Sequence, residues 1–135
     1  MMRALLGGRV LGLASVSSAQ SPEAVLAYYE NLAQQADAAF TPSEERGKAF
    51  YFTQYPYRGD KTVGCTTCHG DHPTDRGRTR AFKPLNPLAP SVSSERLTDI
   101  QHVEKWMRRG CKDVLKRPCS VQEKADVVRF LMVVK

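Results

Sequence analysis

Residues Cys65, Thr66, Thr67, Cys68 and His69 form a C-x-x-C-H motif, which is the attachment signature of c-type haem. Two thiols three positions apart can reach the two vinyl groups on one edge of a porphyrin and form thioether bonds. The imidazole of the next residue then lies under the ring, where it can bind the iron axially. The motif therefore predicts one covalent haem c, held by Cys65 and Cys68, with His69 as the proximal iron ligand.

Three other interpretations of this motif stay open at the level of the sequence. A C-x-x-C pair can be a thioredoxin-like redox pair, but that requires a βαβ surround, which this chain does not offer. It can be half of a zinc site completed by His72, Cys111 and Cys119, although two ligands eight positions apart are unusual. A short pattern can also arise by chance. His72, in a polar turn, and His102, on a predicted helix, are expected to be solvated rather than to bind a metal.

Four helices are predicted to position this motif, over residues 22–38, 43–54, 99–110 and 121–133. Each start carries a capping signal: Ser21 followed by proline, and capping boxes that begin at Thr41, Thr98 and Ser120. Apolar residues recur at helical spacing along these segments, and no stretch shows a convincing strand period. Residues 73–92 are rich in proline and lack a period, which makes sense if this loop wraps around a group that is not protein. The prediction is an all-α fold with long loops.

The composition and the N-terminus indicate the class of protein and its compartment. A chain of 135 residues is one ordinary domain, and 41% hydrophobic with 25% charged residues excludes a disordered tail, a collagen and a multi-span membrane protein. Residues 1–19 have a basic start, an apolar middle and small residues at Ser17 and Ala19, which predicts a signal peptide cleaved after Ala19. No other stretch approaches the about 20 apolar residues needed to span a bilayer. We therefore expect a periplasmic protein whose residues 20–135 form one monohaem domain.

Cys111 and Cys119 form a second cysteine pair. In an oxidising compartment two free thiols tend to pair, and the short segment between these two can close a loop between successive helices. Such a disulfide contributes roughly 2–3 kcal/mol in the chain-entropy model. Two free buried cysteines remain the alternative.

Several features together carry a resemblance to a known family. Gly47 and Tyr51 lie on an early predicted helix and Phe130 lies on the last one, as in the class I cytochromes c, in which a glycine lets an aromatic residue of the last helix come close. Residues 45–49, 65–70, 87–91, 103–106 and 123–126 match more specifically, and the second cysteine pair matches a family disulfide. The chain, from about residue 21 to residue 131, resembles the sphaeroides haem protein family of small high-spin cytochromes c that bind exogenous ligands. This resemblance implies a class I cytochrome c fold around one covalent haem.

The chain departs from this family at Gly110. The family's distal iron ligand is an asparagine just before the first cysteine of the disulfide, and glycine offers no side chain there. Three outcomes are open for the sixth iron site: it is empty or holds water, Met107 one helical turn earlier reaches the iron, or Lys112 does. Trp106, Gly110 and Lys112 are expected around the distal pocket. Ligation by Met107 would give a conventional low-spin electron carrier.

Basic residues gather in two clusters, one over residues 76–83 and one over residues 105–117, while acidic residues dominate before residue 46. Such clusters suit docking of an acidic redox partner, and the resemblance implies a multihaem cytochrome in that role. Nucleic-acid binding, the generic interpretation of a basic chain, does not fit an exported haem protein. We therefore expect an electron carrier with O2, NO, CO or peroxide as candidate ligands. Whether it is also an oxidase or peroxidase-like enzyme is left open.

Overall fold

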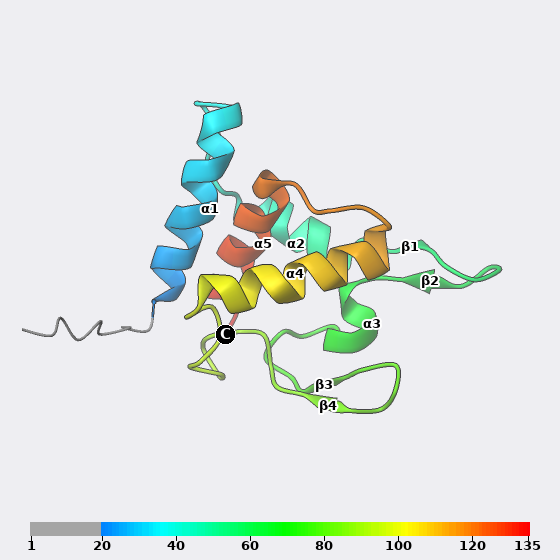
Figure 1. Cartoon of the computed structure of the whole chain (residues 1–135). Coiled ribbons are helices and arrows are strands. Elements are labelled where there is room, and N and C mark those ends of the chain that lie inside the picture. Colours follow the sequence, from blue (N-terminus) through cyan, green and yellow to red (C-terminus); the bar gives the residue numbers. More distant parts are fainter. Residues whose placement is uncertain (1–19) are drawn as a thin grey trace, which may run out of the picture.

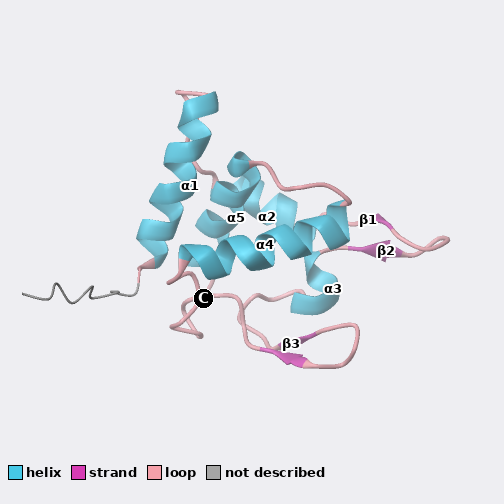
Figure 2. Cartoon of the chain, viewed as in Figure 1, coloured by secondary structure: helices cyan, strands magenta, loops and turns pink. Residues whose placement is uncertain are grey.

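The computed structural model describes residues 20–135, so the predicted signal peptide over residues 1–19 lies outside the described residues. The described part contains five helices (Figure 1): α1 (Pro22–Ala36), α2 (Glu44–Phe52), α3 (Cys65–His69), α4 (Ile100–Leu115) and α5 (Val121–Val133). The prediction of an all-α fold is confirmed, with long loops between the helices (Figure 2). Within residues 20–135, no helix combines the length and the apolar character that a membrane crossing requires.

The helix starts follow the capping signals, with two shifts along the chain. Ser21 accepts a hydrogen bond from the Ala24 amide at 3.1 Å, and Ser120 and Glu123 form the predicted capping box. The α2 cap is Ser43 rather than Thr41, and the α4 cap is Asp99 rather than Thr98. In both cases a neighbouring side chain with an equally good acceptor oxygen takes the N-cap position.

The end of α4 differs from the prediction. The helix was expected to finish at residue 110, near its glycine, but it continues to Leu115 and ends where Lys116 adopts a left-handed conformation, with φ at 59°. Because Cys111 and Val114 are buried, the packing of the last turn outweighs the low helix propensity of Gly110. Gly110 therefore lies inside the helix and not at its end.

Two short hairpins occur where only loops were expected. Strands β1 (Tyr55–Pro56) and β2 (Thr62–Val63) pair antiparallel before α3, and strands β3 (Gly77–Arg78) and β4 (Pro84–Leu85) pair antiparallel after it. Each strand has two residues, which is too short to show a period-2 pattern in the sequence. The two hairpins flank the short helix that carries the cysteine motif (Figure 1).

The core joins α1, α2 and α5. Val25, Tyr29 and Ala33 on α1 are fully buried, as are Ala125 and Val128 on α5. The Tyr29 hydroxyl donates to Glu104 of α4 at 2.7 Å, and the Lys124 ammonium of α5 donates to the same carboxylate at 2.9 Å. Burial opposes ionisation of Glu104, but these two hydrogen bonds outweigh it and lower the pKa of the carboxyl. This network fixes α4 against the core.

Helices α2 and α5 cross at Gly47. A Cβ atom at this position would lie 1.9 Å from the carbonyl oxygen of Asp126 and 2.9 Å from the Cβ of Phe130. The buried Asp126 carboxylate accepts from the Ser43 amide at 2.7 Å and from the Arg46 guanidinium at 2.8 and 2.9 Å. The close approach of glycine to the last helix that the resemblance implied is therefore present, and an ion pair between the exposed Arg46 and the buried Asp126 secures it.

Candidate functional site

Helix α3 is a short helix that opens with Cys65 and ends with His69. Cys65 and Cys68 are three residues apart on it, so their side chains lie on one side of the helix. The Gly64 amide donates to the Thr67 hydroxyl at 2.9 Å, and the Gln54 amide group donates to the Thr66 hydroxyl at 2.9 Å. The two threonines of the motif thus anchor α3 through their hydroxyl groups, and this anchoring uses neither the cysteines nor the histidine.

The end of α3 is anchored to the core. Gly70 follows the helix with φ at 77°, a conformation that favours glycine, and its carbonyl accepts from the Tyr51 hydroxyl of α2 at 2.7 Å. Tyr51 in turn packs on Phe130 of α5, with ring centroids 5.7 Å apart. The crossing of α2 and α5 therefore determines where His69 lies.

Burial sets the protonation of the cysteine motif. Burial, and secondarily the guanidinium of Arg96, lowers the pKa of His69 to about 4, so its imidazole is neutral near pH 7. Burial raises the pKa of the Cys65 thiol to about 11. Arg96 is held by hydrogen bonds to the carbonyls of Asn86 and Pro87, at 2.7 and 2.8 Å. A neutral imidazole with a free lone pair is the form that binds iron.

These residues fit covalent haem and do not fit the competing sites. Cys65 and Cys68 are free thiols, as thioether formation requires, whereas Cys111 and Cys119 are joined in a disulfide with a Cα–Cα distance of 5.6 Å. Zinc ligation by the second pair is therefore excluded, and residues 20–135 hold no cluster of three potential metal ligands. The strands are short antiparallel hairpins, so the βαβ surround of a thioredoxin-like pair is missing from the described part of the chain. His72 is exposed, as expected.

Helix α4 carries the residues expected around the distal pocket. A Cβ atom built on Gly110 meets no other atom within 4 Å, so the space beside it is open. Met107 is half-buried and packs against the hydrophobic core, and Lys112 is exposed. Trp106 is 52% exposed, with the Arg109 guanidinium 5.2 Å from its ring, the Lys105 ammonium at 5.5 Å and His102 against its edge. The structure thus leaves the position before Cys111 without an obstructing side chain.

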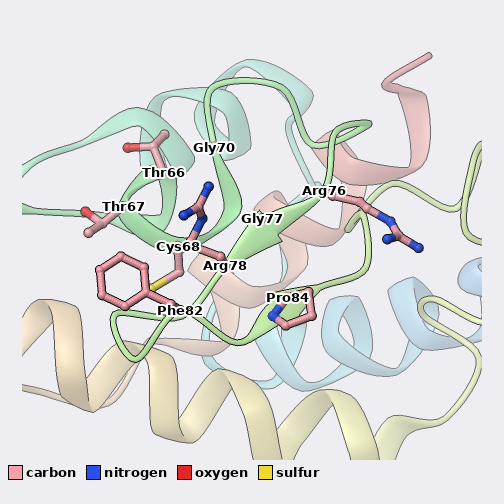
Figure 3. A pocket seen from close by; sticks show the side chains of 9 residues that line it. All are labelled: Thr66, Thr67, Cys68, Gly70, Arg76, Gly77, Arg78, Phe82 and Pro84. Atoms are coloured by element: carbon pink, nitrogen blue, oxygen red, sulfur yellow. The ribbon is translucent and has the colours of Figure 1, made fainter.

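The hairpin of β3 and β4 connects α3 to α4. At one end Gly77 lies against the Cys68 carbonyl, where a Cβ atom would be 2.1 Å from that oxygen. At its tip the Arg80 guanidinium forms an ion pair with Asp113, on the helix that carries Gly110. Between them the hairpin borders an open pocket of about 490 Å³ beside Cys68 (Figure 3).

The contacts of this hairpin could not be predicted from the sequence, because they join residues that are far apart in the chain. Arg80 and Asp113 are 33 residues apart, and the Arg96 contribution to His69 crosses 27 residues. The one available signal was the basic cluster over residues 76–83, which identified Arg80 as one of several cations but gave it no partner.

Comparison with known proteins identifies the family. Residues 37–131 match a family model described as a domain of unknown function, DUF1924. A cytochrome c-type protein SHP from Cereibacter sphaeroides is 38% identical over 131 residues, which cover 97% of this chain and 98% of that protein. The chain belongs to this family of c-type cytochromes.

Two solved structures of the family share the fold. Oxidised cytochrome c'' from Methylophilus methylotrophus matches with a TM-score of 0.77 and 32% identity, over 84% of this chain and 94% of that one. Oxidised SHP, described as an oxygen-binding cytochrome c, matches with a TM-score of 0.73 and 39% identity, over 84% and 97%. The class I cytochrome c fold expected from the sequence is therefore confirmed. As a c-type cytochrome the chain carries covalent haem c, and Cys65 and Cys68 have the attachment spacing.

Proposed function

We propose that this chain is an exported, periplasmic monohaem cytochrome c that transfers electrons and binds O2, NO or peroxide at an open iron site. Bound haem c supplies an iron that cycles between the ferric and ferrous states and accepts small ligands. Cys65 and Cys68 hold the group covalently, and His69 binds the iron on the proximal side through a nitrogen of its neutral imidazole. Residues 20–135 form the haem domain, and residues 1–19 serve as the export signal.

Gly110 is the observation that carries the ligand-binding proposal. It stands on α4 immediately before the disulfide, and the space around its Cα is open. A glycine has no donor atom for the iron, so the sixth position is free for an external ligand or water. Met107 packs against the hydrophobic core, which favours a structural role over the alternative in which its thioether makes a low-spin electron carrier. The SHP relative is described as oxygen-binding, which supports the same function here.

Carbon monoxide tests the open site. The reduced protein should bind CO at once, with an immediate change in its optical spectrum, because no protein ligand must leave first. Gly110→Asn places an amide in the open space, where it competes with CO for the iron. The affinity of this variant for CO should therefore be about tenfold lower than that of the natural chain, the equivalent of about 1.4 kcal/mol. Titration of the two reduced proteins with CO, followed by optical spectroscopy, measures the spectral change and the difference in affinity.

The matched control is Gly59→Asn, the same substitution in the exposed loop between β1 and β2. Gly59 has φ at 63°, which asparagine tolerates, so CO affinity should not change. Met107→Leu should also leave the spectrum as it is. If Met107→Leu instead converts a low-spin spectrum to a high-spin one, Met107 is the sixth ligand and the open-site proposal is wrong.

We propose an acidic redox protein, such as a multihaem cytochrome, as the electron-transfer partner. The two basic clusters of the sequence lie close together in space, because the Arg80–Asp113 ion pair joins the β3–β4 hairpin to α4. On that hairpin Phe82 is 76% exposed, and the Arg78 guanidinium lies 5.9 Å from its ring, beside Cys68 (Figure 3). An exposed aromatic residue with a cation against its ring, next to the attachment site, offers a docking point for an acidic protein.

Charge reversal at this docking point should slow electron transfer. Arg78→Glu replaces attraction by repulsion at the rim of the contact, so the second-order rate with an acidic multihaem cytochrome should fall by about tenfold at low salt and recover at high salt. Stopped-flow mixing over a range of ionic strength measures this. Arg129→Glu, the same change on the exposed face of α5, should have a much smaller effect. Equal effects of the two variants would place the docking surface elsewhere.

A further inference from the structure

The ion pair between Arg80 and Asp113 brings a guanidinium to the helix that carries Gly110. Asp113 follows Gly110 by three residues on α4, so the two positions are neighbours on the helix surface, about 5–6 Å apart between Cβ positions. Arg80 comes from the loop between β3 and β4, and Asp113 holds its side chain there. A positive group from the hairpin therefore lies beside the opening that the missing side chain of Gly110 leaves.

Arg80 has hydrogen-bonding capacity to spare. A guanidinium carries five N–H donors, and within the described part of the chain Arg80 uses one of them, donating from Nη2 to the Asp113 carboxylate. The Tyr57 ring lies against one face of the guanidinium, with the centroid 5.2 Å from Cζ. Contact with the ring leaves the N–H groups in the guanidinium plane able to donate to a further anion.

The charges on the β3–β4 hairpin and on the second half of α4 are strongly unbalanced. Residues 76–84 contain four basic side chains and no acidic one, and residues 108–117 contain five basic side chains and Asp113 alone. That carboxylate is already matched by Arg80, and the Lys116 ammonium donates to the Asp113 carbonyl at 2.7 Å. Arg109 and Lys112, which adjoin Gly110 on α4, are exposed and pair with no carboxylate in the described part of the chain. The potential at the opening is therefore positive.

We infer that the open site, in its ferric form, favours small anionic ligands, with Arg80 as the residue that confers this selectivity. This inference rests on the proposed open site and names the class of ligand that it prefers. The local positive charge would attract an anion that enters the opening beside Gly110, and the free N–H groups of Arg80 could donate a hydrogen bond to it. A neutral ligand such as CO gains neither interaction. Azide and nitrite represent the class, and azide serves as the probe.

Ligand titrations of Arg80→Gln test the selectivity. Removal of one guanidinium at a solvent-exposed site should weaken azide binding to the ferric haem protein by about fivefold. A loss of this size is what one charge interaction contributes when solvent screens it. The CO affinity of the ferrous protein should change by less than about twofold, because CO carries no charge. Azide affinity of the natural chain should also fall as salt rises, and this dependence should be weaker in the variant.

Two further variants separate charge from structure. Arg80→Lys keeps the positive charge and should keep most of the azide affinity. Arg129→Gln removes the same charge from the exposed face of α5 and should leave both affinities unchanged. Far-UV circular dichroism melts of the haem-loaded proteins should be alike, since the Arg80 side chain is 38% exposed.

The outcomes distinguish this inference from the proposed function. If azide and CO affinities fall together in Arg80→Gln, or if Arg129→Gln weakens azide equally, Arg80 is not a selectivity residue. If azide affinity is the same in Arg80→Gln and the natural chain, the inference is wrong while the open site stands. If the natural chain binds neither azide nor CO, the proposed open site itself is wrong.

Discussion

Gly47→Ala should destabilise the folded haem protein by more than about 4 kcal/mol, which is exceptional for the addition of one methyl group. The new Cβ atom would lie 1.9 Å from the Asp126 carbonyl oxygen and 2.5 Å from its carbon. Both atoms belong to the backbone of α5, so no side-chain rotation relieves the overlap. The two helices must move apart, and this breaks the close-packed interface that positions α3. Urea unfolding followed by far-UV circular dichroism measures the loss.

The matched control for this effect is Gly110→Ala on α4. A Cβ atom at Gly110 meets nothing within 4 Å, so the substitution adds no overlap and gains about 1 kcal/mol of helix propensity. The two variants make the same chemical change inside two helices, and only the surroundings differ. Similar unfolding free energies for the two proteins would contradict the close crossing of α2 and α5.

A buried carboxylate makes the crossing of α2 and α5 still less tolerant of a larger side chain at Gly47. The side chain of Asp126 is 7% exposed, and its oxygens depend on Ser43 and Arg46 of the α2 region for hydrogen bonds. Separation of the helices weakens these bonds and leaves a buried charge without partners, which adds to the packing loss. The sequence indicated the glycine at this crossing, because Gly47 is part of the family resemblance. It gave no sign of the ion pair, since Arg46 and Asp126 are 80 residues apart.

Local signals in this sequence predicted local structure well. Ser21 and Ser120 cap their helices as expected. The short helix α3 over the C-x-x-C-H motif was not predicted, because five residues are too few to show a helical period. Predictions that required tertiary packing were less accurate. Gly110 was placed at the end of α4, but the buried Cys111 and its disulfide carry the helix past it to Leu115. A propensity scale has no access to that burial.

The same limit explains what was missed at the site. His69 could be identified from the motif, but the burial that keeps its imidazole neutral depends on loops folded around it. The positive charge of Arg96 near it, and the ion pair of Arg80 with Asp113, join segments far apart in the chain. Spacing within the motif therefore predicts which atoms can bond to a haem, whereas their protonation and their charged neighbours come from the fold.

His69→Ala should remove axial coordination of the iron while the covalent attachment remains. Cys65 and Cys68 are unchanged, so denaturing gels stained for haem should still show the group on the chain. The optical spectrum should lose its His-ligated form, and the protein should lose at least about 3 kcal/mol of stability, because a partly buried side chain is truncated and its bond to the iron is lost. Added imidazole should restore the spectrum by occupying the vacated space.

His72→Ala is the matched control, because it removes an exposed imidazole only three residues away. Its spectrum and stability should equal those of the natural chain. The contrast between these two histidines follows from their surroundings: α3 and the Tyr51–Gly70 hydrogen bond hold His69 in a partly buried position, whereas His72 follows in an exposed turn. If His72→Ala alters the iron spectrum and His69→Ala does not, the proximal ligand has been assigned to the wrong residue.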